Sequence, residues 1–289
     1  MDAGAGEAAT EAEAGEVATG AKTPGSANGP DAEVRYEVTG QTATVTMNRP
    51  DARNMLTASG MALLAELLRT AGKDPGVRVI VLTGSGNTFC SGADLRGASA
   101  ADARSFTGSG PQALVGVLTA ILDNPKPVIA RVQGHVAGGG NGLVAAADLS
   151  VAVDSARFAF SEVRLGLAPA VISVVCLARM HRADAQELLL TGDRVPAARM
   201  SAAGMVNRVV TGDELDATVE AWVTSLCAGG PQALAHTKDL LRSVPGMTRE
   251  AGFAHTAELS ARLFASPEAG AGMLAFLSRQ PAPWVVAGS

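Results

Sequence analysis

Apolar segments of strand length alternate with segments of helical periodicity between residues 34 and 153, and this order constrains the fold more than any other feature of the sequence. Such alternation is typical of the α/β class. Thr57 is expected to cap the first helix, and Gly72 is expected to stop it. We expect a hairpin at 34–47, strands at 77–82, 128–132 and 149–153, and helices at 57–70, 112–122 and 140–147.

The sequence after Val210 carries only helical patterns, at 214–227, 232–244, 249–265 and 267–278. Residues 1–30 differ from both parts, because they consist almost entirely of Ala, Gly, Glu, Thr and Ser and have no apolar period. The expected organisation is a disordered tail at 1–30, a mixed core at 31–210 and a helical C-terminal subdomain at 211–289.

The composition argues against several classes of partner. The chain has 23 Lys and Arg against 28 Asp and Glu, so its net charge of -5 offers no general attraction to nucleic acid or to an anionic membrane. No apolar run approaches the roughly 18 residues of a membrane helix. The three cysteines match neither a disulfide framework nor a metal motif, and the acidic N-terminal residues fit no targeting peptide. We therefore expect a protein of the reducing cytoplasm that binds no metal.

Two glycine-containing loops each follow a short buried strand, at residues 89–95 and 133–143, and the second leads directly into a helix. Glycine lets the backbone approach a ligand, and the free N–H groups of a helix start carry the positive end of the helix dipole. The second loop is therefore suited to bind an anion or a developing oxyanion, although a plain tight turn stays open. Leu143 stands where a dinucleotide-binding motif would need its third glycine.

Glu162 lies between apolar neighbours, in the segment 158–169. Desolvation in such a place raises the pKa of a carboxyl group, which then exchanges protons near neutral pH. The alternative is a structural ion pair with Arg164 or another arginine. Three other residues carry less chemistry: we expect a structural His135, a buried apolar Cys90, and an Asp94 that caps a loop or helix rather than acting as a second acid.

Taken in order, these segments resemble the crotonase (enoyl-CoA hydratase/isomerase) superfamily, over residues 32 to about 284. The motifs that carry the resemblance are MNRP at 47–50, FCSGADL at 89–95, GHVAGGG at 134–140, SEVRLGLAP at 161–169 and LTGDR at 190–194. The resemblance implies a ββα spiral core with two roughly perpendicular sheets and a helical C-terminal region that forms homotrimers or dimers of trimers. It also implies acyl-CoA substrates, with coenzyme A as part of the substrate and no further cofactor.

The resemblance also implies roles for individual residues. The backbone N–H groups of Ala93 and Gly139 would form an oxyanion hole for the thioester oxygen, and Glu162 would move the proton at the α-carbon. Further substrate-binding positions follow from the same motifs. They are Ala52, Arg53, Gly92, Asp94, Leu95, Gly138 and Gly142.

The chain departs from the best-known hydratases at Gly142, where those enzymes have the first of two glutamates. Local sequence around Gly142 and Glu162 looks most like methylglutaconyl-CoA hydratase-type bacterial enzymes, which also lack that glutamate. The expected function is therefore an enoyl-CoA hydratase, with a Δ3-Δ2 enoyl-CoA isomerase or a catalytically weak acyl-CoA-binding protein as alternatives. Glycine at 142 is expected to leave open space that admits a branched acyl group or a water molecule.

Overall fold

The computed structural model describes residue 29, residues 32–94 and residues 103–285, with the side chains of 103–109 excepted. The expected tail at 1–30, apart from Gly29, and the expected substrate contact Leu95 therefore lie outside the described residues.

Two sheets form the centre of the fold. The larger has six strands, in the order β1 (Val34–Thr39), β2 (Thr42–Met47), β3 (Val79–Gly84), β5 (Val128–Val132), β7 (Leu149–Val153) and β10 (Arg208–Val210). The smaller has four, in the order β4 (Thr88–Cys90), β6 (His135–Ala137), β8 (Arg157–Ala159) and β9 (Val195–Pro196). Only β1–β2 and β8–β9 pair antiparallel, and the other neighbouring strands within each sheet run parallel.

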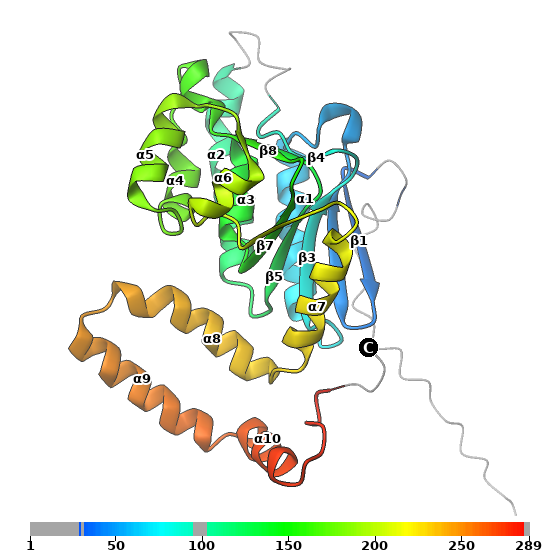
Figure 1. Ribbon diagram of the computed structural model, residues 1–289, viewed down its shortest axis with the longest axis vertical. Coiled ribbons are helices and arrows are strands. Elements are labelled where there is room, and N and C mark those ends of the chain that lie inside the picture. The colour runs from blue at the N-terminus through cyan, green and yellow to red at the C-terminus, as the bar shows by residue number, and fades with distance from the viewer. Residues whose placement is uncertain (1–28, 30–31, 95–102, 286–289) are drawn as a thin grey trace, which may run out of the picture.

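The chain winds as a spiral. Each turn supplies one strand to the larger sheet and one to the smaller sheet, and a helix then leads the chain back to the larger sheet. β3 and β4 are followed by α2 (Ala103–Leu122), and β5 and β6 by α3 (Gly139–Ala146). β7 and β8 lead into a 3-10 turn, η2 (Ser161–Leu165), and then α4 (Ala170–Cys176). This architecture confirms the expected α/β fold with a ββα spiral core (Figure 1).

The three helices expected in the core are present as α1 (Ala58–Lys73), α2 and α3, with two differences. Thr57 caps α1 by accepting a hydrogen bond from the N–H of Gly60 at 2.8 Å, as expected. The expectation that Gly72 stops this helix is wrong, since α1 continues to Lys73. A Cβ at Gly72 would lie 3.0 Å from the amide of Asn124, so this glycine permits close packing. α2 begins nine residues before the expected start at 112 and includes Pro111.

Short helical turns and further helices complete the described chain. They are η1 (Pro50–Ala52), α5 (Arg182–Thr191), α6 (Ala197–Ala202), α7 (Leu215–Cys227), α8 (Pro231–Ser243) with η3 (Val244–Gly246), α9 (Arg249–Phe264) and α10 (Pro267–Leu277). α7 packs on the six-stranded sheet, whereas α8 to α10 project from the core as a C-terminal arm (Figure 1). The four helical segments expected after Val210 are thus present in the described chain.

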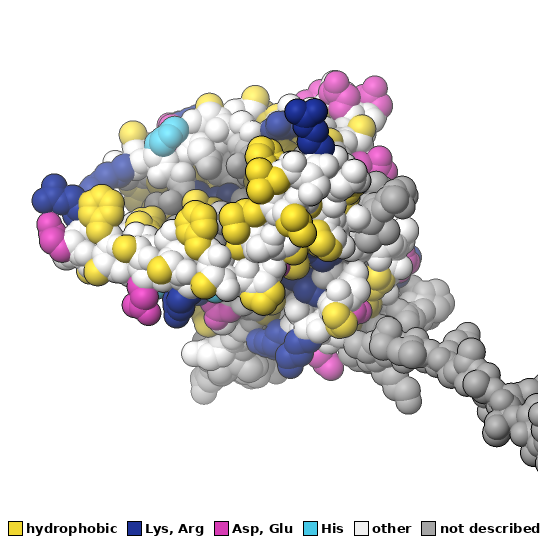
Figure 2. Space-filling model, turned by 90° about the horizontal axis from the view of Figure 1, so that it is seen from below, with side chains coloured by type: hydrophobic (Ala, Val, Ile, Leu, Met, Phe, Trp, Pro, Cys, Tyr) yellow, Lys and Arg dark blue, Asp and Glu magenta, His cyan; other side chains and the backbone are white. Residues whose placement is uncertain are grey.

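The arm exposes large apolar side chains along its length. The side chains of Leu241, Phe253, Phe264, Leu274, Phe276 and Leu277 are all between 67% and 82% exposed. Seen from below, hydrophobic side chains gather along this arm (Figure 2). Arg78 ties the root of the arm to the core, donating hydrogen bonds to the carbonyls of Gly229 at 2.6 Å and Trp284 at 3.2 Å.

Candidate active site

A cavity of about 400 Å³ lies where the loops after β4 and β6 meet η2, α2 and α4. Most of its wall is apolar, which is typical of small-molecule sites. The wall is formed by Leu56, Met61, Ser91, Gly92, Ala93, Gly110, Pro111, Leu114, Gly138, Gly139, Ser161, Glu162, Leu165, Leu167, Ala168, Pro169, Ala170, Val171 and Ile172. It brings together Ala93, Gly139 and Glu162, the three residues expected to carry the chemistry.

Close packing of the glycine loops forms one side of this cavity. Gly92 has a φ of +91°, in the left-handed region that favours glycine. A Cβ on Gly92 would lie 3.4 Å from the N atom of Gly139, so the two loops touch. Behind them, a Cβ on Gly140 would lie 2.6 Å from the carbonyl oxygen of Cys90. The two loops can approach this closely only because glycine occupies these positions.

Two backbone N–H groups are left free beside the cavity. Ala93 forms a parallel bridge with Leu56, in which the hydrogen bonds run from the N–H of Leu56 to the carbonyl of Gly92 at 2.8 Å and from the N–H of Asp94 to the carbonyl of Leu56 at 3.0 Å. In such a bridge the N–H of the central residue points to the other side. Gly139 is the first residue of α3, whose N–H has no acceptor within the helix. No acceptor for either group occurs in the part of the chain that the structure describes.

Glu162 lies in the first turn of η2, and its side chain is partly buried. Its Oε2 atom is buried and has no hydrogen-bond partner among the described residues. Desolvation by burial raises the pKa of this carboxyl above its ordinary value, against a smaller lowering by its own backbone N–H. An ion pair with Arg164 is therefore not what holds Glu162 in place.

Arg164 instead pairs with the carboxylate of Asp193 and donates to the carbonyl of Thr191 at 3.3 Å. Thr191 is the last residue of α5 and Asp193 follows it, so Arg164 ties η2 to the end of that helix. The Glu162 carboxyl is thus available to a bound molecule, with a pKa shifted toward the range of a general acid or base.

Ser91 lines the same cavity but was not singled out by the sequence. Its Oγ atom is buried and, within the described residues, has no hydrogen-bond partner. A buried hydroxyl without a partner costs stability unless a ligand or water satisfies it. The signal that could have found Ser91 is its place directly before Gly92 in the first glycine loop.

The expected coenzyme A contacts lie at the edge of this loop. Ala52 is buried at the end of η1, and the exposed Arg53 adopts a left-handed φ of 52°. The carbonyl of Arg53 accepts a hydrogen bond from the N–H of Ser91 at 3.2 Å, which joins this turn to the loop. Asp94 forms an ion pair with Arg49 at 3.2 Å, and its expected capping role stays a prediction, because the residues that follow it lie outside the described ranges.

Gly142 is buried one turn into α3, and the open space expected beside it does not exist. A Cβ at this position would lie 2.5 Å from Cγ2 of Ile172 and 3.5 Å from Cδ2 of Leu118. The side chain of Ile172 therefore fills the place of a side chain at 142. Gly142 is not among the residues that line the cavity, whereas Ile172 is.

His135 and Cys90 are placed as the sequence suggested. Nδ1 of His135 accepts a hydrogen bond from the N–H of Arg157 at 3.1 Å, and His135 does not line the cavity. Cys90 is completely buried, and burial raises the pKa of its thiol to about 12. In the described ranges, no group of three His, Cys, Asp or Glu side chains is arranged to hold a metal ion.

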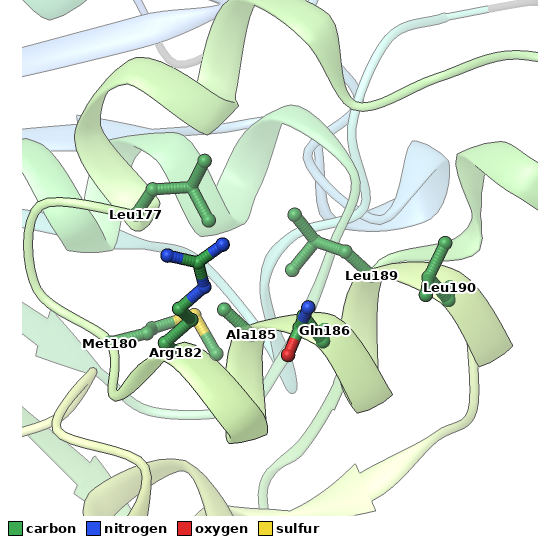
Figure 3. Close-up of a pocket in the computed structure, with 7 residues that line it drawn as sticks. All are labelled: Leu177, Met180, Arg182, Ala185, Gln186, Leu189 and Leu190. Carbon is green, nitrogen blue, oxygen red and sulfur yellow. The ribbon is translucent and has the colours of Figure 1, made fainter.

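A second cavity, of about 510 Å³, lies between the end of α4 and the face of α5 (Figure 3). Its wall is formed by Leu177, Met180, Arg182, Ala185, Gln186, Leu189 and Leu190. Although it is larger than the first, it contains no carboxylate or other group suited to acid-base chemistry among these residues. Of the two cavities, the one lined by Glu162 holds the carboxyl suited to proton transfer. Among the helices described, none is long and apolar enough to cross a lipid bilayer.

Comparison with known proteins supports the resemblance that the sequence motifs indicated. A sequence model of the enoyl-CoA hydratase/isomerase family matches residues 37–286. An enoyl-CoA hydratase of Mycobacterium tuberculosis is 33% identical over 88% of this chain and 96% of its own length. A carnitinyl-CoA dehydratase of Salmonella arizonae is 33% identical over 87% of this chain and 97% of its own.

Solved structures show the same similarity. The crystal structure of an enoyl-CoA hydratase of Mycobacterium smegmatis superimposes with a TM-score of 0.83 at 34% identity, covering 88% of this chain and 99% of that one. That of an enoyl-CoA hydratase/isomerase of Marinobacter aquaeolei gives a TM-score of 0.82 at 30% identity, covering 88% of this chain and 99% of that one.

Proposed function

The chain belongs to the enoyl-CoA hydratase/isomerase family, and from this membership we propose that it is an enoyl-CoA hydratase in which Glu162 transfers the proton. One observation carries the proposal. A cavity wall with two free backbone N–H groups also holds a carboxyl oxygen that is buried and unpartnered among the described residues. A buried carboxyl without a partner is costly to a protein that only binds, whereas it is what proton transfer requires.

In the proposed reaction, the thioester oxygen of a 2-enoyl-CoA accepts hydrogen bonds from the N–H groups of Ala93 and Gly139. These donors stabilise the enolate charge that develops when the oxygen of water bonds to C3. One proton of that water passes to the Glu162 carboxylate, which then protonates C2 of the enolate. The product is a 3-hydroxyacyl-CoA, and the carboxylate is regenerated.

The substrate-binding positions predicted from the sequence complete the proposal. Gly92 and Gly138 would let the thioester approach the backbone, while Ala52, Arg53 and Asp94 would lie along the coenzyme A moiety. Support comes from the junction of the Arg53 turn with Ser91. The relatives named for hydration and dehydration of CoA thioesters support this substrate class, and no cofactor beyond coenzyme A is proposed. A branched substrate of the methylglutaconyl type stays a prediction.

A second function, Δ3-Δ2 enoyl-CoA isomerase, is favoured by a specific observation. Ile172 occupies the space beside Gly142, so the protein places no second carboxylate there. One carboxylate suffices to take a proton from C2 and return it to C4, with the same oxyanion hole holding the dienolate.

The exposed apolar side chains of the arm support assembly as a homotrimer or a dimer of trimers. The three free, buried thiols support a reducing cytoplasm as the site of action. Neither nucleic acid nor a membrane is proposed as a partner.

The proposal is tested by incubating the protein with a panel of 2-enoyl, 3-enoyl and 3-methylglutaconyl CoA thioesters and following the absorbance of the conjugated enoyl thioester. Loss of absorbance from a 2-enoyl substrate supports hydration, and a gain from a 3-enoyl substrate supports isomerisation. Tight binding of every thioester without any change would leave the acyl-CoA-binding alternative and refute the enzyme.

A further inference from the structure

We infer that Ile172 determines which acyl groups the cavity accepts, because its side chain occupies the place that a side chain at position 142 would take and forms the cavity wall there. The inference rests on the proposed function in one respect only, namely that the substrates are acyl-CoA thioesters. The packing on which it depends is a property of the fold and is testable without turnover.

A side chain at position 142 would overlap the side chain of Ile172. Cγ2 of Ile172 would lie 2.5 Å from a Cβ on Gly142, and Cβ of Ile172 would lie 3.1 Å from it. The first distance is shorter than any normal contact between carbon atoms. A side chain at 142 therefore forces Ile172 or the backbone of α3 to shift, and a smaller residue at 172 relieves the contact.

Ile172 joins this contact to the substrate cavity. It is only 2% exposed, and it lines the cavity on the third residue of α4. Cys176 lies one turn further along the same face of α4; burial raises the pKa of its thiol, and the charge of Glu162 adds a smaller rise. The Glu162 carboxyl is therefore within electrostatic reach of the helix face that carries Ile172.

The contact between Ile172 and Gly142 makes one wall of the cavity apolar and sets the width of the cavity at that wall. Val171 and Ile172 form that wall, and neither holds a water molecule by hydrogen bonding. The shape of the wall at Ile172 thus selects which acyl chains fit, while Glu162 transfers the proton. A single methylene in such a pocket changes discrimination by about 10- to 200-fold.

The first test truncates this wall. Ile172→Ala removes the Cγ atoms and Cδ1, and it should raise the ratio of kcat/KM for the 2-methyl-branched tiglyl-CoA over linear crotonyl-CoA by about tenfold or more. The matched control is Val174→Ala, which shortens a side chain that is 75% exposed on the same helix. This control should leave the ratio unchanged. An unchanged ratio in a folded Ile172→Ala protein would overturn the inference.

The second test needs no turnover. Gly142→Ala should lower the melting temperature by several degrees in the native background, but should lower it little or not at all in the Ile172→Ala background, because the clashing Cγ2 is gone. Equal losses in both backgrounds would overturn the packing pair.

Binding separates failure of the inference from failure of the proposed function. Butyryl-CoA and 2-methylbutyryl-CoA carry no double bond and are not turned over, so the rise in melting temperature that each causes reports affinity alone. Ile172→Ala should shift this preference toward the branched thioester. If it does so in a protein that converts no enoyl-CoA, the proposed function fails and the role of Ile172 stands.

Discussion

Replacement of Glu162 by Gln separates the chemical role of this side chain from its structural role. Gln keeps the shape but neither accepts nor donates the proton at the α-carbon. The expected result is a loss of about 10²- to 10⁴-fold in kcat, the usual contribution of a general acid or base, with little change in affinity for the CoA thioester. The same change should stabilise the protein near neutral pH.

The sign of the stability effect follows from the pKa. Burial raises the pKa of Glu162 in the folded protein above 4.5, so between that value and the raised pKa the folded state binds more protons than the unfolded state. The free energy of unfolding therefore falls as pH rises through this window. The neutral amide of the Glu162→Gln variant carries no such penalty. The difference in melting temperature between this variant and the native protein should therefore be positive at pH 7 and should shrink on acidification.

The measurements are initial rates with the thioester panel and thermal melts, both taken from about pH 4 to about pH 8, a range that spans the titration of a carboxyl with a raised pKa. Because the carboxylate form accepts the proton, native kcat/KM should rise with pH through a value above 4.5. Glu66→Gln makes the same chemical change on an exposed residue of α1 and should alter neither property. Retained turnover in a Glu162→Gln protein of reduced stability would show that Glu162 is structural, and would refute the reasoning.

Three further outcomes are expected. Ser91→Ala should raise KM for the thioester about threefold to tenfold, because the substrate loses a hydrogen-bonding group. It should not lower the melting temperature, because the hydroxyl that it removes is buried and has no partner among the described residues. An unchanged KM would contradict a contact between Ser91 and the substrate. Gly134→Ala should yield little folded protein by circular dichroism, since its Cβ would lie 2.0 Å from the carbonyl oxygen of Asn87; a native melting temperature contradicts this. Light scattering at micromolar concentration should report a trimer or hexamer, and a monomer contradicts the role given to the exposed arm.

The core elements were predictable because their signals are local. The strands β5 and β7 begin and end at the expected residues, since an apolar run bounded by turn residues is typical of a buried strand. The helix ends were less predictable. Gly72 has the character of a stop signal, but Asn124 and Lys126 come from far along the chain and supply hydrogen bonds to the carbonyls of Leu68 and Ala71. Contacts between residues so far apart in the chain cannot be predicted from the local sequence.

The residues at the site were predictable in part. The order of strands and helices indicated that the glycine loops after the strands carry the site, and the resemblance to the family added Glu162 to it. Whether Glu162 pairs with Arg164 was not decidable from the sequence, because Arg164 pairs instead with Asp193, which lies far along the chain after α5. Ser91 is not predictable in this way, because a serine in a glycine loop is common and only its burial without a partner among the described residues distinguishes it.

Gly142 shows why the absence of a side chain is a poor sign of open space. Protein interiors pack as densely as organic crystals, so a small residue within a buried helix predicts a large neighbour rather than a void. That neighbour is Ile172, which is distant in sequence and on a different helix, so no local pattern could name it. In a chain with this pair, a glutamate at 142 meets the side chain of Ile172, so a second carboxylate there requires Ile172 to move or to be replaced by a smaller residue. The single-carboxylate chemistry proposed for Glu162 is therefore built into the packing between α3 and α4.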